Sequence, residues 1–67
     1  MKLIEKRENF VIIEITAFEM NNSGFDVVWD DIRNVYSEKE YIVESVTKNH
    51  DGKIILIKLT RNRYLLN

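Results

Sequence analysis

The residues that could do chemistry in this 67-residue chain are few and scattered. His50 is the only histidine, so it is the only side chain expected to titrate near neutral pH without perturbation. It stands beside Asp51 in a run of turn-forming residues, where a general base would lack a pocket. Two donors are also too few for a zinc site, which takes three or four. We therefore expect His50 to be a solvated turn residue and predict no metal centre.

The carboxylates and serines do not improve the case for catalysis. Asp30 and Asp31 are adjacent, and neighbouring positions on a helix point about 100° apart, so these two carboxylates would not converge on one substrate. The chain contains no Gly-rich phosphate loop, no nucleophile elbow and no Cys. The sequence predicts no catalytic residue, no cofactor and no enzyme activity.

The charged residues divide the chain into an acidic middle and a basic end. The net charge is -1, so the distribution is more informative than the sum. Acidic residues outnumber bases between Glu14 and Glu44, and bases dominate after Ser45. This asymmetry is consistent with partners of opposite sign, or with attraction between the two parts of the chain.

Two candidate binding surfaces follow from this distribution. The first, for a protein partner, comprises acidic residues of the middle segment: Asp26, Asp30, Asp31, Glu38 and Glu40. On a helix, such residues more often form a solvated face than a recognition surface. The second, for RNA or DNA, comprises bases and one aromatic residue of the C-terminal arm: Lys53, Lys58, Arg61, Arg63 and Tyr64. Alternation along a strand would put Lys58 on the face opposite to the other bases, so the protein partner is favoured.

Turn signals and hydrophobic patterning predict the strands that carry these residues. The segment from Phe10 to Phe18 is rich in β-branched residues and apolar on both faces over its first half, which is typical of a central strand. Residues 1–5 are expected to pair with it as an edge strand. Residues 40–48 and 53–60 flank the turn formers 49–52, and this arrangement predicts a β-hairpin.

A helix is predicted from Ser23 to Tyr36. Ser23 would be its N-cap, with an acidic residue three positions later. The apolar residues recur at i, i+3, i+4, i+7 and i+11 along one stripe: Phe25, Val28, Trp29, Ile32 and Tyr36. A competing interpretation treats Phe25 to Trp29 as an alternating strand, but the longer stripe explains more residues. The stripe also favours Trp29 as a core residue over Trp29 as an interface anchor.

Together these elements predict one α+β domain spanning residues 1–67. Its order is β(β)αββ, with a small antiparallel or mixed sheet of three to five strands and one helix packed on a face. The structural alternative is an SH3-like small β-barrel. The absence of Cys fits a reducing compartment, and no signal-peptide core or membrane-spanning run is visible. A cytoplasmic protein without a membrane partner is therefore expected.

The function predicted from these observations is that of a non-enzymatic protein-binding module. It would act as an inhibitor, adaptor or accessory regulatory subunit that docks on a larger protein. The apolar strands exceed what one helix can cover, so burial against a partner or a homodimer is expected. The amino-acid composition lacks Pro and Cys and is rich in Ile, Asn and Lys. In this respect it is similar to that of small proteins encoded by phages or mobile elements. The alternative is a small nucleic-acid-binding regulator that uses the basic arm.

Overall fold

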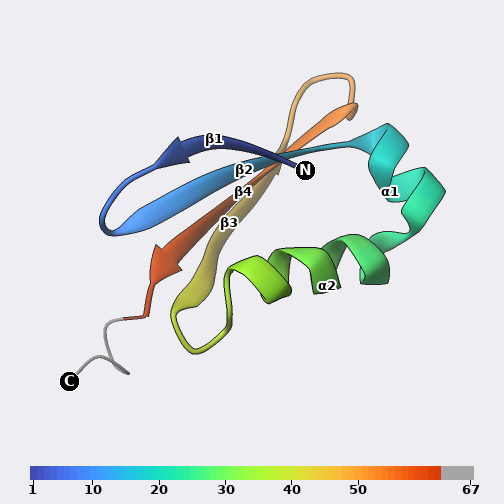
Figure 1. Cartoon of the computed structure of the whole chain (residues 1–67). Helices are drawn as coiled ribbons and strands as arrows, with labels where there is room; N and C mark the ends of the chain where they lie inside the picture. Colours follow the sequence, from blue (N-terminus) through green and yellow to red (C-terminus); the bar gives the residue numbers. More distant parts are fainter. Residues whose placement is uncertain (63–67) are drawn as a thin grey trace.

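A computed structural model describes residues 1–62. The elements follow one another as two strands, two helices and two strands (Figure 1). Their bounds are β1 Lys2–Lys6, β2 Phe10–Thr16, α1 Ala17–Ser23, α2 Phe25–Val35, β3 Tyr41–Lys48 and β4 Ile54–Arg61. The strands form an open sheet in the order β1-β2-β4-β3, and every neighbouring pair is antiparallel. None of the helices in this part of the chain is long and apolar enough to cross a membrane.

The predicted α+β class and antiparallel sheet are confirmed, and the predicted hairpin corresponds to β3 and β4. Two findings differ from the expectation. The sheet is open, so no SH3-like barrel forms. The expected single helix is in fact two helices, because the chain leaves the sheet at Thr16 and turns helical well before Ser23. Ser23 is thus the last residue of α1 and not the N-cap of the longer helix.

The start of α1 is determined by a reciprocal cap at Thr16. The Thr16 hydroxyl accepts a hydrogen bond from the Glu19 amide at 3.2 Å, and the Glu19 carboxylate accepts one from the Thr16 amide at 3.5 Å. This capping box satisfies two backbone donors that a helix leaves unpaired at its first turn. It therefore ends β2 and begins α1 at adjacent residues.

Gly24 separates the two helices. Its φ of +84° and ψ of +152° lie in a region that essentially only glycine occupies. Its amide still closes α1 on the Met20 carbonyl at 2.9 Å, and its carbonyl accepts the first hydrogen bond of α2 from Val28 at 3.2 Å. One residue therefore ends the first helix, changes the chain direction and starts the second.

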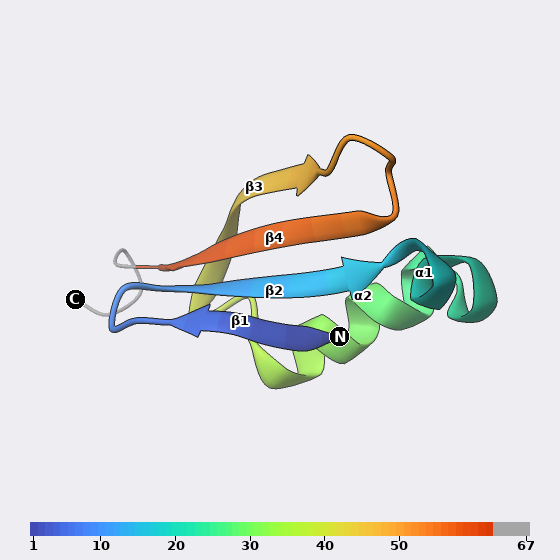
Figure 2. The same ribbon diagram turned by 90° about the horizontal axis from the view of Figure 1, so that it is seen from above.

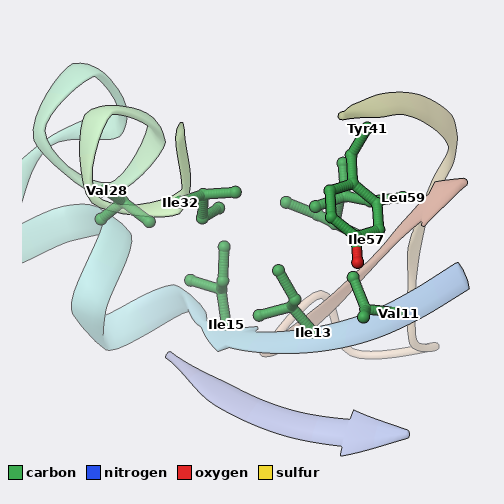
Figure 3. Packing of buried hydrophobic residues seen from close by; sticks show 8 residues of the cluster. All are labelled: Val11, Ile13, Ile15, Val28, Ile32, Tyr41, Ile57 and Leu59. Atoms are coloured by element: carbon green, nitrogen blue, oxygen red, sulfur yellow. The ribbon is translucent and has the colours of Figure 1, made fainter. Parts of the chain in front are cut away.

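Both helices lie on the same side of the sheet (Figures 1 and 2). The core lies between the sheet and α2, where Val28 and Ile32 point toward the strands (Figure 3). The other core residues come from the strands, and they are Val11, Ile13 and Ile15 of β2, Tyr41 of β3, and Ile57 and Leu59 of β4. Each fully buried Ile or Leu contributes about 1.5–3 kcal/mol of burial free energy. The core is thus concentrated on the two central strands.

Candidate functional site

The inner face of the sheet, which faces α2, is unevenly covered. Ile13 of central strand β2 is only 1% exposed, whereas Val43 and Val46 of edge strand β3 are 37% and 55% exposed. In β3 only Tyr41, at the end where α2 joins the strand, is buried. Helix α2 therefore leaves most of the inner side of β3 open.

An apolar groove occupies this open region, between α2 and the β3–β4 hairpin. Its volume is about 320 Å³. The helical wall comprises Met20, Phe25, Val28, Trp29 and Ile32. The strand wall comprises Ile15, Val46, Lys48, Ile55 and Ile57. Lys48 is the only polar residue of the lining, so the groove is suited to an apolar surface rather than to a polar substrate.

Two aromatic rings form the helical wall of the groove. Phe25 and Trp29 stack with their ring centroids 6.0 Å apart and their planes 9° apart. Phe25 is 58% exposed, so this stack is open to solvent on one side. The guanidinium of Arg33 lies 4.9 Å from the centre of the Trp29 ring. Trp29 packs against the core, as its place in the stripe predicts, and it also lines the groove.

Arg33 joins the C-terminal end of α2 to the beginning of β3. Its Nη1 donates hydrogen bonds to the backbone carbonyls of Tyr41 at 3.0 Å and of Tyr36 at 3.4 Å. This geometry directs the guanidinium toward carbonyl oxygens and the Trp29 ring, not toward the carboxylate of Asp30. This contact therefore ties the end of α2 to the first residue of β3.

The acidic residues predicted to bind a protein do not gather into one patch. Asp26, Asp30 and Asp31 are exposed on α2, and within residues 1–62 no cation lies within 4.0 Å of their carboxylates. Glu38 lines a shallow depression in the loop after α2. Glu40 forms an ion pair with Arg61 at 3.7 Å.

The bases predicted to bind nucleic acid are spread along β4. Lys53 precedes the strand and Arg61 ends it, so about 26 Å separates them at 3.3 Å per residue. Lys58 is paired with Glu44 at 2.8 Å and also lies 4.6 Å from the Phe10 ring centre. Arg63 and Tyr64 lie outside the described residues. Among the described bases, this arrangement does not present a phosphate-binding row.

Two carboxyl groups of residues 1–62 have shifted pKa values. The hydrogen bond from Lys58 holds the pKa of Glu44 below its ordinary value, although desolvation acts in the opposite direction. The pKa of Glu19 is also lowered, chiefly by its hydrogen bond from the Met1 amino group and further by the backbone of Thr16. Both shifts come from structural contacts outside the groove, so neither indicates a catalytic acid.

The chemistry-bearing residues weighed from the sequence do not converge on the groove. His50 is exposed in the turn between β3 and β4. Within residues 1–62, no three His, Asp or Glu side chains lie close enough together to hold a metal ion.

Neither of the two binding surfaces predicted from the sequence includes the groove residues Phe25, Val46 and Lys48. The sequence signal available for these residues was the excess of apolar strand over what a single helix can cover.

The chain matches no protein-family model, no curated protein and no solved structure.

Proposed function

We propose that this chain is a non-enzymatic protein-binding module that docks on a larger protein through the groove between α2 and the β3–β4 hairpin. The observation that carries the proposal is the exposure of Phe25 and Val46 on facing walls of one apolar groove. Such a patch is unfavourable in water and is typical of a surface that another molecule covers. Aromatic side chains such as Phe25 and Trp29 also provide much of the binding energy at protein interfaces.

A contact made in this way gives the module the role of an inhibitor, adaptor or accessory regulatory subunit, according to which surface of the partner it covers. The partner that we propose is a larger protein. The alternative occupant is a second copy of the chain, and light scattering on the purified protein distinguishes the two.

Site-specific photocrosslinking in the native host tests the proposal. A photoreactive residue is placed at Val46 in the groove or, as the matched control, at Val27. Both valines are about half exposed, at 55% and 52%, but Val27 lies on the side of α2 turned away from Trp29. We expect a discrete crosslinked partner from position 46 and none from position 27. Equal products at both positions, or none at position 46, would contradict the proposal.

A quantitative measurement follows the capture. The identified partner is purified, and its affinity for the wild-type chain is compared with that for Val46→Asp. A buried carboxylate without a counter-charge is strongly unfavourable, so the affinity is expected to fall at least about tenfold. Val27→Asp is the control and should retain wild-type affinity. A crosslinked product at twice the mass of the chain would identify a homodimer instead.

A further inference from the structure

We infer that the segment of the partner that enters the groove is apolar and carries a carboxylate, which forms an ion pair with Lys48 on the strand wall. This inference rests on the proposed function and specifies the chemistry of the partner. The observation that carries it is a single cation, without a counter-charge among residues 1–62, in a lining that is otherwise apolar.

Strand pairing places Lys48 on the inner face of the sheet. Lys48 lies opposite Ile55 of β4, and Ile55 in turn lies opposite Ile15 of β2. Residues that face each other in this way across antiparallel strands have their side chains on the same face. All three residues line the groove. The strand wall therefore combines two isoleucines with one ammonium group in the same row of the sheet.

Lys48 differs from the other bases of β3 and β4 in its charge environment. Lys58 is paired with Glu44 at 2.8 Å, and Arg61 is paired with Glu40 at 3.7 Å. Within residues 1–62, no carboxylate lies within 4.0 Å of the Lys48 amine. The hairpin therefore neutralises its bases outside the groove and leaves the base in the groove for another molecule.

Helix α2 places a second cation beside the groove and no carboxylate in its lining. The Arg33 guanidinium lies 4.9 Å from the centre of the Trp29 ring, and its Nη1 donates to backbone carbonyls. At about 100° per residue, Asp30 projects away from the sheet, and Asp26 lies farther round the helix from Trp29 than Arg33 does. The cations are therefore nearer to the groove than the anions and favour an occupant of negative charge.

An apolar occupant without an acid would be penalised at Lys48. The side chain is exposed, so water solvates its ammonium group in the free protein. An occupant that covers the groove removes part of this water, and the loss is offset when the oxygen atoms of a carboxylate replace it. The apolar walls and the single cation together select an apolar segment with an acidic side chain.

A second copy of this chain, packed groove to groove, does not supply that acid. A two-fold interface brings the same surface of both copies together. Two Lys48 and two Arg33 side chains would then share one interface, and neither lining contributes a carboxylate. Like charges at an interface weaken association, so a different protein with an acidic segment is the better occupant.

Two amphiphiles of opposite charge test the preference of the groove without the partner. Octanoate and octyltrimethylammonium share the same alkyl chain and differ in the head group. Trp29 is the only tryptophan of the chain and lines the groove, so its emission reports binding. We expect octanoate to shift this emission to shorter wavelength with saturation. Octyltrimethylammonium should bind about threefold more weakly, although the net charge of the chain is -1.

Charge-matched variants locate this preference. Lys48→Met removes the charge and keeps an unbranched side chain, and it should weaken octanoate binding about threefold. Lys2→Met removes the same charge from β1, at the opposite edge of the sheet, and should leave the affinity within about 1.5-fold of wild type. Unfolding curves of both variants check that they are folded.

The partner captured through position 46 provides the direct measurement. The purified partner and the chain are treated with a carbodiimide, which joins an amine to a carboxylate in contact with it. We expect mass spectrometry to find a crosslink between Lys48 and an aspartate or glutamate of the partner. The affinity of the partner should be at least about threefold lower for Lys48→Met than for Lys2→Met.

The inference is overturned if octanoate gives no saturable shift, if the two amphiphiles bind equally, or if the two variants behave alike. A Lys48→Met protein that binds the partner as tightly as wild type would show that the lysine stem covers the wall while its amine stays in water. That result, or a captured partner without a carboxylate at Lys48, would end the inference while the proposed function stands. Absence of any captured partner would remove the proposed function, and the inference with it.

Discussion

The hydroxyl of Thr16 and the backbone amide of Glu19 lie 3.2 Å apart, and the hydrogen bond between them marks the residue where β2 becomes α1. The carboxylate of Glu19 accepts a hydrogen bond from the Thr16 amide in return. Because α1 has only seven residues, it depends on this cap more than a long helix would, since short helices are marginal without such contacts.

Replacing Thr16 by Ala is expected to reduce the free energy of unfolding by about 1 kcal/mol, because the first turn of α1 loses its side-chain acceptor. Urea denaturation followed by circular dichroism measures the change. Thr47→Ala on the exposed edge strand is the control, and it should change stability by less than about 0.5 kcal/mol. Equal effects at the two positions would show that the cap contributes nothing specific.

Gly24→Ala is expected to destabilise the protein by about 1–3 kcal/mol, because a Cβ is strained at its positive φ. The space around Gly24 is open, with no atom within 4 Å of an added Cβ, so a steric clash does not contribute. Thermal unfolding of Gly24→Ala beside Ser23→Ala separates the backbone effect from a change at an exposed neighbour. A Gly24→Ala protein as stable as the wild type would show that the chain does not need this conformation.

Arg33→Met is expected to lower stability by about 1–2 kcal/mol, because the Tyr41 carbonyl loses a charged donor. The same variant should change the Trp29 fluorescence of the folded protein, because the guanidinium leaves the face of the ring. Lys39→Met in the exposed loop is the control for loss of one positive charge. If the Trp29 spectrum does not change, Arg33 does not determine the environment of the groove.

The ion pair between Glu44 and Lys58 is expected to make the stability of the fold depend on pH. Its pKa is lower in the folded state than in the unfolded state because of Lys58. The pair therefore stabilises the fold above the ordinary pKa of glutamate, about 4.3, and this contribution is lost as the pH falls through the lowered pKa. Between about pH 6 and about pH 3, the free energy of unfolding should fall less steeply for Glu44→Gln than for wild type.

Lys58→Met removes the other member of the same pair and should flatten the pH profile to a similar degree. Because Glu44 is exposed at the sheet surface, added salt should also reduce the difference between variant and wild type. A Glu44→Gln profile with the wild-type slope would show that the ion pair does not affect stability.

Much of the sheet could be predicted from local patterns. The turn formers 49–52 between two β-rich runs predict a hairpin, and the apolar segment beginning at Phe10 predicts a central strand; β3, β4 and β2 are found there. The stripe of Phe25, Val28 and Ile32 predicts a helix with one apolar side, which α2 confirms. These features depend on neighbours a few residues apart, so the order of residues is sufficient to define them.

Helix α1 is not among the predicted elements, although the sequence contains a signal for its start. Thr16 and Glu19 have the spacing of a capping box, which signals a helix start. The β-branched run before them and the asparagines after them instead favour a strand followed by a turn. The structure shows that the cap determines where the strand ends.

The amino-acid sequence by itself determined the strands of the sheet, the apolar stripe of α2 and the scarcity of polar groups suited to chemistry. Only the tertiary structure decided that α2 leaves Val46 of β3 uncovered, that Arg33 binds the Tyr41 carbonyl, and that the excess of apolar strand forms a groove. The physical reason is that periodicity records which side of an element is apolar. How much of that side is buried depends on the distance and angle between elements far apart in the chain.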